Sequence, residues 1–149
     1  MAVSDASDAE RLAHVLSQTE ARVTRALEKV LARENCSVEQ WRALALLADG
    51  GPHSMSEIAG FALVSASSLT RLVDRLVAEN LAYRLPDPSD RRRILVHITD
   101  RGQESYRRAC QQIARDEDAI VSAADWPGLE LLTELVVGAS RRRSASAGR

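Results

Sequence analysis

The 149-residue sequence predicts a mainly α-helical chain with one small β-ribbon, and two observations carry this prediction. Two short helical patterns with a tight connection occupy residues 54–80. Two β-prone runs follow within 81–99, and they flank a proline-bracketed polar loop that ends in three arginines. Helix, turn, helix and a ribbon with a cationic tip are the elements of a winged helix-turn-helix, which can engage DNA through both the second helix and the ribbon.

Composition fits one folded domain and excludes several classes of protein. Apolar residues make up 45% of the chain, and no apolar run approaches the roughly 20 residues of a membrane-spanning helix. The N-terminal residues do not resemble a secretory signal, and Cys36 and Cys110 match no metal spacing, so we expect a cytoplasmic protein with no cofactor. The scattered histidines His14, His53 and His97 form no catalytic set, so we expect no enzyme.

The charge is distributed unevenly although the net charge is only −1. Residues 1–64 carry six basic and nine acidic side chains, whereas residues 65–108 carry nine arginines and six acidic side chains. A modest basic patch on a nearly neutral protein suits a specific DNA binder.

The first part of the chain predicts two helices. Residues 8–33 carry an apolar stripe at spacings of three and four, which is longer than a helix needs for the core of its own domain. Ser37–Gln40 has capping-box spacing and opens a helix to about Ala48, which Asp49–Pro52 ends.

The middle of the chain predicts the helix-turn-helix and the ribbon. Ser54–Glu57 repeats the capping box and opens a short helix to about Ala62. Ser65 caps a helix to about Asn80, and strands follow at about 82–85 and 93–98.

The last part of the chain predicts two more helices. Thr99 is the expected N-cap of a helix from Asp100 to about Ala123. Trp126–Gly128 marks a turn before a last helix to about Val137, and the tail at 141–149 has the composition of a disordered segment.

The helix predicted at 65–80 has two different faces. Leu69, Leu72, Val73 and Leu76 repeat at helical spacing and predict a buried face. The other face is small and hydroxylated, then cationic, which suits entry into a groove and bonding to bases or phosphates: Ser65, Ser67, Ser68, Thr70, Arg71, Asp74 and Arg75. An ordinary capped surface helix would share this pattern, but the neighbouring helix and ribbon favour a recognition helix.

The ribbon loop offers a second contact. Pro86 and Pro88 stiffen it, and Asp87, Ser89 and Asp90 supply turn chemistry. Arg91, Arg92 and Arg93 follow, and one or two of them must point to solvent or DNA. The alternative is a solvated hairpin in which these arginines pair with Asp87 and Asp90.

The segment from Ser54 to Gly102 resembles the MarR family of bacterial transcription regulators. The resemblance rests on four motifs: the helix Thr70–Leu76, the strand pattern E-x-L-x-x-R from Glu79, the wing pattern D-x-x-D-R-R from Asp87 and the ending I-T-x-x-G from Ile98. Asn80 stands where the family usually has glycine, and asparagine tolerates a left-handed cap.

The resemblance implies a single domain over residues 1–149 that works as a homodimer. Residues 8–33 and 100–138 would supply dimerisation helices from both termini, and residues 37–99 would form a winged-helix DNA-binding lobe on a palindromic operator. The implied function is that of a ligand-responsive transcriptional repressor that binds double-stranded DNA.

The resemblance also implies roles for individual residues. Ser65, Ser67, Ser68, Thr70 and Arg71 would face the major groove, and Arg75 would contact phosphate or brace the helix. Arg92, between Arg91 and Arg93, would enter the minor groove. Asp90 would hold that arginine or shape the loop, and Asp74 would pair the helix with the wing.

An effector is the least defined part of the expected function. Family members often bind small aromatic or anionic ligands, and the candidate lining residues here are His14, Trp41, Arg42 and Tyr83. Helical spacing also favours Trp41 as a core residue and His14 as a surface residue. Two alternatives stay open: a redox regulator that uses Cys36, whose thiolate the adjacent helix start would favour, and a winged-helix protein-interaction module without DNA binding.

Overall fold

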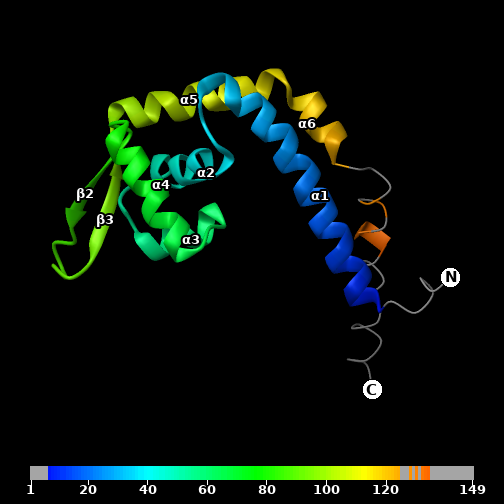
Figure 1. Cartoon of the computed structure of the whole chain (residues 1–149), viewed down its shortest axis with the longest axis horizontal. Coiled ribbons are helices and arrows are strands. Elements are labelled where there is room, and N and C mark those ends of the chain that lie inside the picture. The colour runs from blue at the N-terminus through cyan, green and yellow to red at the C-terminus, as the bar shows by residue number, and fades with distance from the viewer. Residues whose placement is uncertain (1–6, 125–127, 129, 131, 135–149) are drawn as a thin grey trace. The chain divides into compact units, whose positions relative to one another are not determined.

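The computed structural model describes residues 7–124, 128, 130 and 132–134 (Figure 1). Contacts divide the chain into two compact units, residues 28–115 and residues 1–27 with 116–149. The elements in chain order are α1 (Asp8–Leu31), a 3-10 turn (Ala32–Glu34), α2 (Val38–Ala48), β1 (His53–Ser54), α3 (Met55–Ala62), α4 (Ala66–Ala78), β2 (Ala82–Pro86), β3 (Ile94–Ile98), α5 (Asp100–Arg115) and α6 (Glu117–Ala123). The fold is therefore mainly helical with a small β-wing, as predicted.

Both predicted capping boxes are formed. At the start of α2, Ser37 N donates to Gln40 Oε1 at 3.0 Å and Gln40 N donates to Ser37 Oγ at 3.1 Å. At the start of α3, Ser54 N donates to Glu57 Oε2 at 2.7 Å and Glu57 N donates to Ser54 Oγ at 3.3 Å. Each box satisfies two backbone groups at a helix start, which is why four-residue patterns located both helices correctly.

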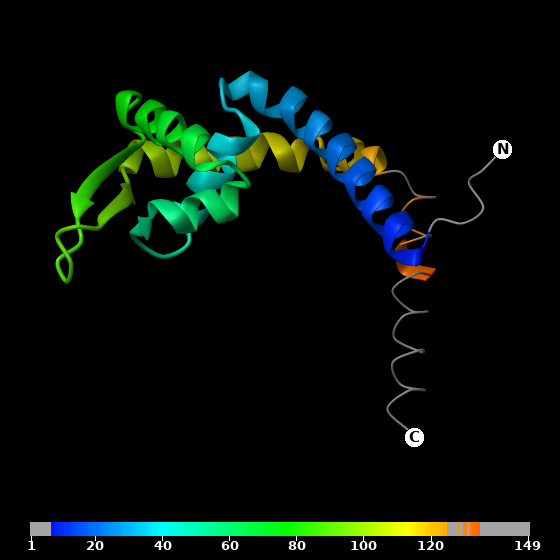
Figure 2. The same cartoon turned by 60° about the horizontal axis from the view of Figure 1, so that its bottom comes forward.

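The sheet has three antiparallel strands in the order β1-β3-β2. The ribbon of β2 and β3 pairs from Ala82 with Ile98 to Pro86 with Ile94. Figures 1 and 2 show its loop extending away from the helices of the 28–115 unit. The sequence did not predict β1, in which His53 pairs with Val96, because two residues are too few to show an alternating pattern.

The core of the 28–115 unit is built around α2, which contacts α3, α4, α5 and β3. Fully buried side chains come from each layer of this unit: Leu44, Leu47, Ile58, Val73, Leu76 and Val96. Among the described residues, no helix combines the length and apolar character of a membrane span.

Two predicted boundary residues have the expected geometry. Asn80 adopts φ 57°, the left-handed conformation for which asparagine was expected to substitute for glycine. Thr99 Oγ1 accepts a hydrogen bond from Gly102 N at 2.9 Å, so Thr99 caps α5.

The prediction of one helix from Asp100 to about Ala123 was wrong. Helix α5 ends at Arg115, and α6 begins at Glu117 after a turn at Asp116. A basic residue closes α5 and acidic residues open α6, so each charge has the sign that the adjoining helix end favours. Trp126, Pro127, the end of the last helix and the 141–149 tail lie outside the described residues, whereas Gly128, Glu130 and residues 132–134 are helical.

Candidate nucleic-acid interface

Helices α3 and α4 are joined by a tight turn that fixes where α4 begins. Leu63 closes α3 in the left-handed conformation with φ 58°. Ser65 then caps α4, and its Oγ accepts from Ser68 N at 3.3 Å. The Ser65 hydroxyl lies within 3.1 Å of the Ser67 and Ser68 hydroxyls, so these three predicted interface residues form one polar cluster at the start of α4.

Helix α4 has the two faces that the sequence predicted. Leu69, Leu72, Val73 and Leu76 are buried, whereas the seven polar residues of the predicted groove-facing side are all exposed. Arg71 and Arg75 form no ion pair with any described residue. Their guanidinium groups are therefore available to an anionic partner.

The wing loop is organised around Asp87, whose side chain is largely buried. Its Oδ1 accepts from Ser89 N at 2.8 Å and Ser89 Oγ at 2.6 Å, and Arg93 Nη1 lies 3.7 Å from Oδ2. These hydrogen bonds, first that of the Ser89 hydroxyl, hold the pKa of Asp87 below its ordinary value. Arg93, a predicted DNA contact, therefore pairs with Asp87. For this one arginine, the structure agrees with the alternative prediction of a hairpin whose arginines pair with aspartates.

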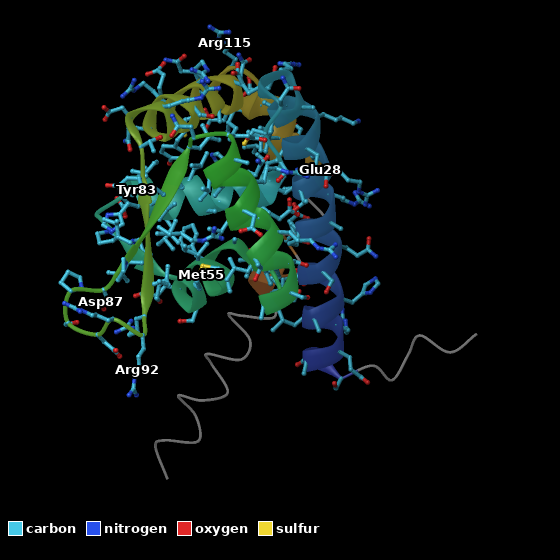
Figure 3. The ribbon with its side chains drawn as sticks, turned by 60° about the vertical axis from the view of Figure 1, so that its left-hand side comes forward. Glu28, Met55, Tyr83, Asp87, Arg92 and Arg115 are labelled. Carbon is cyan, nitrogen blue, oxygen red and sulfur yellow. The ribbon has the colours of Figure 1, made fainter. Side chains whose placement is uncertain are left out.

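Asp90 shapes the loop through the backbone. Its Oδ1 accepts from Arg92 N at 3.0 Å, and its carbonyl oxygen accepts from Arg93 N at 2.9 Å. Among the described residues, the side chains of Arg91 and Arg92 form no ion pair, and Figure 3 shows Arg92 pointing away from the protein at the wing tip. Of the two roles predicted for Asp90, the structure has the loop-shaping one.

An ion pair ties the wing to α4. Arg84 Nη2 on β2 lies 2.6 Å from Asp74 Oδ1, so Asp74 pairs helix and wing as the resemblance implied. Arg84 was not among the residues for which the sequence predicted a role. Two signals pointed to it: Arg84 ends the E-x-L-x-x-R pattern of the resemblance, and it is half-buried between the exposed residues Tyr83 and Leu85.

Of the four candidate effector residues, Trp41, Arg42 and Tyr83 lie in the 28–115 unit and His14 lies in the other unit. Tyr83 stacks on His97 with ring centroids 4.9 Å apart, on the wing. Trp41 and Arg42 are half-buried in α2, and Trp41 Nε1 is buried without a hydrogen-bond partner among the described residues. His14 is exposed on α1, in the other unit, where it lines a cavity of about 320 Å³.

The expectation that Cys36 favours a thiolate was wrong. Burial, followed by the charges of Glu79 and Glu34, raises the pKa of this thiol to about 11. The nearby helix start does not outweigh these effects, so the structure gives no support to a redox regulator that uses Cys36. Within the described part of the chain, no cluster of His, Cys, Asp or Glu could hold a metal ion.

The chain is similar in sequence to known transcription regulators. The model of the MarR family matches residues 36–94. The transcriptional repressor IacR of Pseudomonas putida is 32% identical over 68% of this chain and 60% of its own length. The transcriptional regulator FarR of Neisseria gonorrhoeae is 29% identical over 72% of this chain and 73% of its own length.

Solved structures with the same fold include two ligand-bound proteins. A mutant MarR of E. coli complexed with operator DNA has a TM-score of 0.69 at 22% identity, covering 86% of this chain and 92% of that one. NadR in complex with 4-hydroxyphenylacetate has a TM-score of 0.68 at 25% identity, covering 93% of this chain and 95% of NadR.

Proposed function

The chain belongs to the MarR family, and from this premise we propose that it is a sequence-specific DNA-binding transcription regulator. One observation supports the proposal most. In the 28–115 unit, α4 and the wing tip expose arginines that form no ion pair with any described residue, and the Asp74–Arg84 ion pair joins α4 to the wing. Because the bridge ties β2 to α4, groove contacts by the helix and wing contacts would be made in a fixed register.

The exposed groups fit different parts of DNA. The small side chains at the start of α4 allow close approach to base edges, and Arg71 is long enough to reach guanine or phosphate. Arg91 and Arg92 on the narrow wing suit the minor groove or the backbone. The predicted contacts of Asp90 and Arg93 are indirect in this proposal, since both shape the loop that presents Arg92.

We propose that the regulator is a cytoplasmic, ligand-responsive repressor and that it has no catalytic step. Its matched relatives are named as repressors and regulators, and NadR was solved with a small aromatic acid. A small aromatic or anionic effector is the proposed class of ligand, with His14, Trp41, Arg42 and Tyr83 as the candidate lining residues.

The direct test is selection of binding sites from random double-stranded DNA by the purified full-length chain. We expect enrichment of a palindrome, because a twofold dimer presents two equal helices. Failure to enrich any sequence, with a partner protein still bound after Arg91, Arg92 and Arg93 are all changed to alanine, would favour the protein-interaction module instead.

Changing the wing-tip arginine should weaken operator binding. We expect Arg92→Ala to cost roughly 1–3 kcal/mol of binding free energy and to lower the salt slope by about one unit if a phosphate contact is lost. Fluorescence anisotropy over a salt series measures both quantities. Arg107→Ala, on an exposed part of α5, removes the same charge and should leave both unchanged, and an Arg92→Ala variant equal to it would contradict the role.

Arg71 and Arg75 should make different kinds of DNA contact, Arg71 with a base and Arg75 with a phosphate. Loss of a base contact changes which bases are preferred, whereas loss of a phosphate contact weakens all sequences alike. We expect Arg71→Ala to relax specificity at one position in each half-site and Arg75→Ala to lower affinity uniformly. Binding profiles over all single-base variants of the selected site decide this, and a parallel profile for Arg71→Ala would assign base reading to Thr70 or Ser68.

We propose that the functional unit is a homodimer. The stripe on α1 is only partly covered in one chain: Val15 and Leu27 are buried, but Leu16 is 49% exposed. The apolar residues of the predicted last helix lie mostly outside the described residues. Sedimentation at micromolar concentration should show one species of twice the chain mass, and a clean monomer would also remove the argument for a palindrome.

A further inference from the structure

A polar cavity of about 290 Å³ lies within the 28–115 unit, and none of the proposed DNA contacts is among its lining residues. One wall is formed by Arg101, Ser105 and Arg108, whose spacing places them on one face of α5. Glu34 and Cys36, before α2, and Glu79, at the end of α4, are also in the lining. The cavity is thus bounded by three segments that are distant in sequence.

The charges that line the cavity are matched only in part. Arg108 Nε lies 3.2 Å from Glu34 Oε2, and Glu34 Oε1 accepts from Gln112 Nε2 at 3.1 Å, so this pair is satisfied. Arg101 forms no ion pair with a described residue. Glu79 accepts only a long hydrogen bond of 3.5 Å from neutral Gln40 Nε2, among the bonds that the described residues make. One cation and one anion on different segments are left unmatched.

We propose that this cavity binds a small zwitterion with the chemistry of a free α-amino acid, its carboxylate on Arg101 and its ammonium on Glu79. A volume near the lower limit of ligand sites favours a small ligand, and the polar lining favours a polar one. Ser105 adds a neutral hydroxyl. The thiol of Cys36 adds no charge, because burial and the two glutamates raise its pKa to about 11.

The bound molecule would act at the joint between α4 and α5. Glu79 N donates to Arg75 O at 2.9 Å at the end of α4, Thr99 N donates to Leu81 O at 3.0 Å, and Thr99 Oγ1 donates to Asn80 O at 2.7 Å. A ligand held by Glu79 and Arg101 would span this joint. If the proposed function holds, occupancy would change operator affinity by changing how α4 is held.

Calorimetric titration of the DNA-free full-length protein tests the site. The probes are the twenty standard α-amino acids, each tested singly, then the matched acid without the amino group and the matched amine without the carboxyl group. We expect one site per chain for at least one amino acid, with affinity at least about tenfold weaker for both matched compounds and for Arg101→Gln and Glu79→Gln. Arg107→Gln, outside the cavity on the same helix, should bind as wild type.

The outcomes separate this proposal from the proposed function. No binding up to about 10 mM, or binding that survives both cavity variants, would overturn it. Equal affinity for the amino acid and for the matched acid would contradict the proposal that the ligand is a zwitterion. Circular dichroism of each variant shows whether a loss of binding is caused by unfolding. Site selection is scored separately on DNA, so binding of an amino acid without any selected DNA would support the cavity and contradict the regulator.

Discussion

Gly102→Ala is expected to lower the free energy of unfolding by about 3 kcal/mol or more. A Cβ at this position would lie 2.0 Å from the backbone oxygen of Leu81 and 2.8 Å from Ile98 Cγ1. The Leu81 oxygen already accepts from Thr99 N, so it cannot move without loss of that hydrogen bond. Helix α5 can approach the end of α4 this closely only where the side chain is absent.

Gly60→Ala is the matched control, because no atom lies within 4 Å of the Cβ that it would add. Gly60 lies in α3, where alanine should stabilise the helix by up to about 1 kcal/mol. Urea unfolding of both variants measures the difference. Equal stability of the two variants would mean that the contact between α5 and Leu81 adjusts without cost, which would contradict the predicted clash.

Leu76→Ala should destabilise the protein by about 2–5 kcal/mol. The Leu76 side chain is fully buried at 0% exposure and anchors α4 in the core that also contains Leu44, Ile58 and Val96. Truncation of this side chain removes buried apolar contacts and leaves a cavity between α4 and the rest of the core. We also expect weaker operator binding, since α4 loses its support.

Thr70→Ala is the control for Leu76→Ala. It also introduces alanine into α4, but on the exposed face, so it changes helix propensity without removing a buried side chain. Thr70 Oγ1 makes only a long hydrogen bond of 3.5 Å to Ala66 O, so its loss should change stability by no more than about 0.5 kcal/mol. Thermal and urea unfolding should therefore rank the variants clearly. A Leu76→Ala variant as stable as Thr70→Ala would contradict the assigned core.

Much of the recognition surface could be predicted because its pattern is local. The serines and arginines of α4 are exposed because the leucines of the same helix are buried, and one helical period decides both. The sequence predicted the loop of the wing, but it did not predict which group the Asp90 carboxylate binds. Its short side chain can reach either a guanidinium or a backbone N–H, and only the folded loop shows that it accepts from Arg92 N.

Several features were beyond reach of the sequence because they join segments that are distant along the chain. Strand β1 exists through its pairing with β3, and Arg84 gains its role only beside Asp74 on another element. The helix start next to Cys36 suggested a thiolate, but burial and the charge of Glu79, from the end of α4, reverse that expectation.

By itself, the sequence determined where α2, α3, α4 and α5 begin, which face of α4 is buried and that a cationic ribbon follows α4. Caps and periodic patterns act over a few residues, so they can be read without the fold. Only the tertiary structure decided which charges are paired, which thiol is buried and where a backbone leaves no room for a side chain. Those properties depend on distances between elements, and packing, not spacing along the chain, determines these distances.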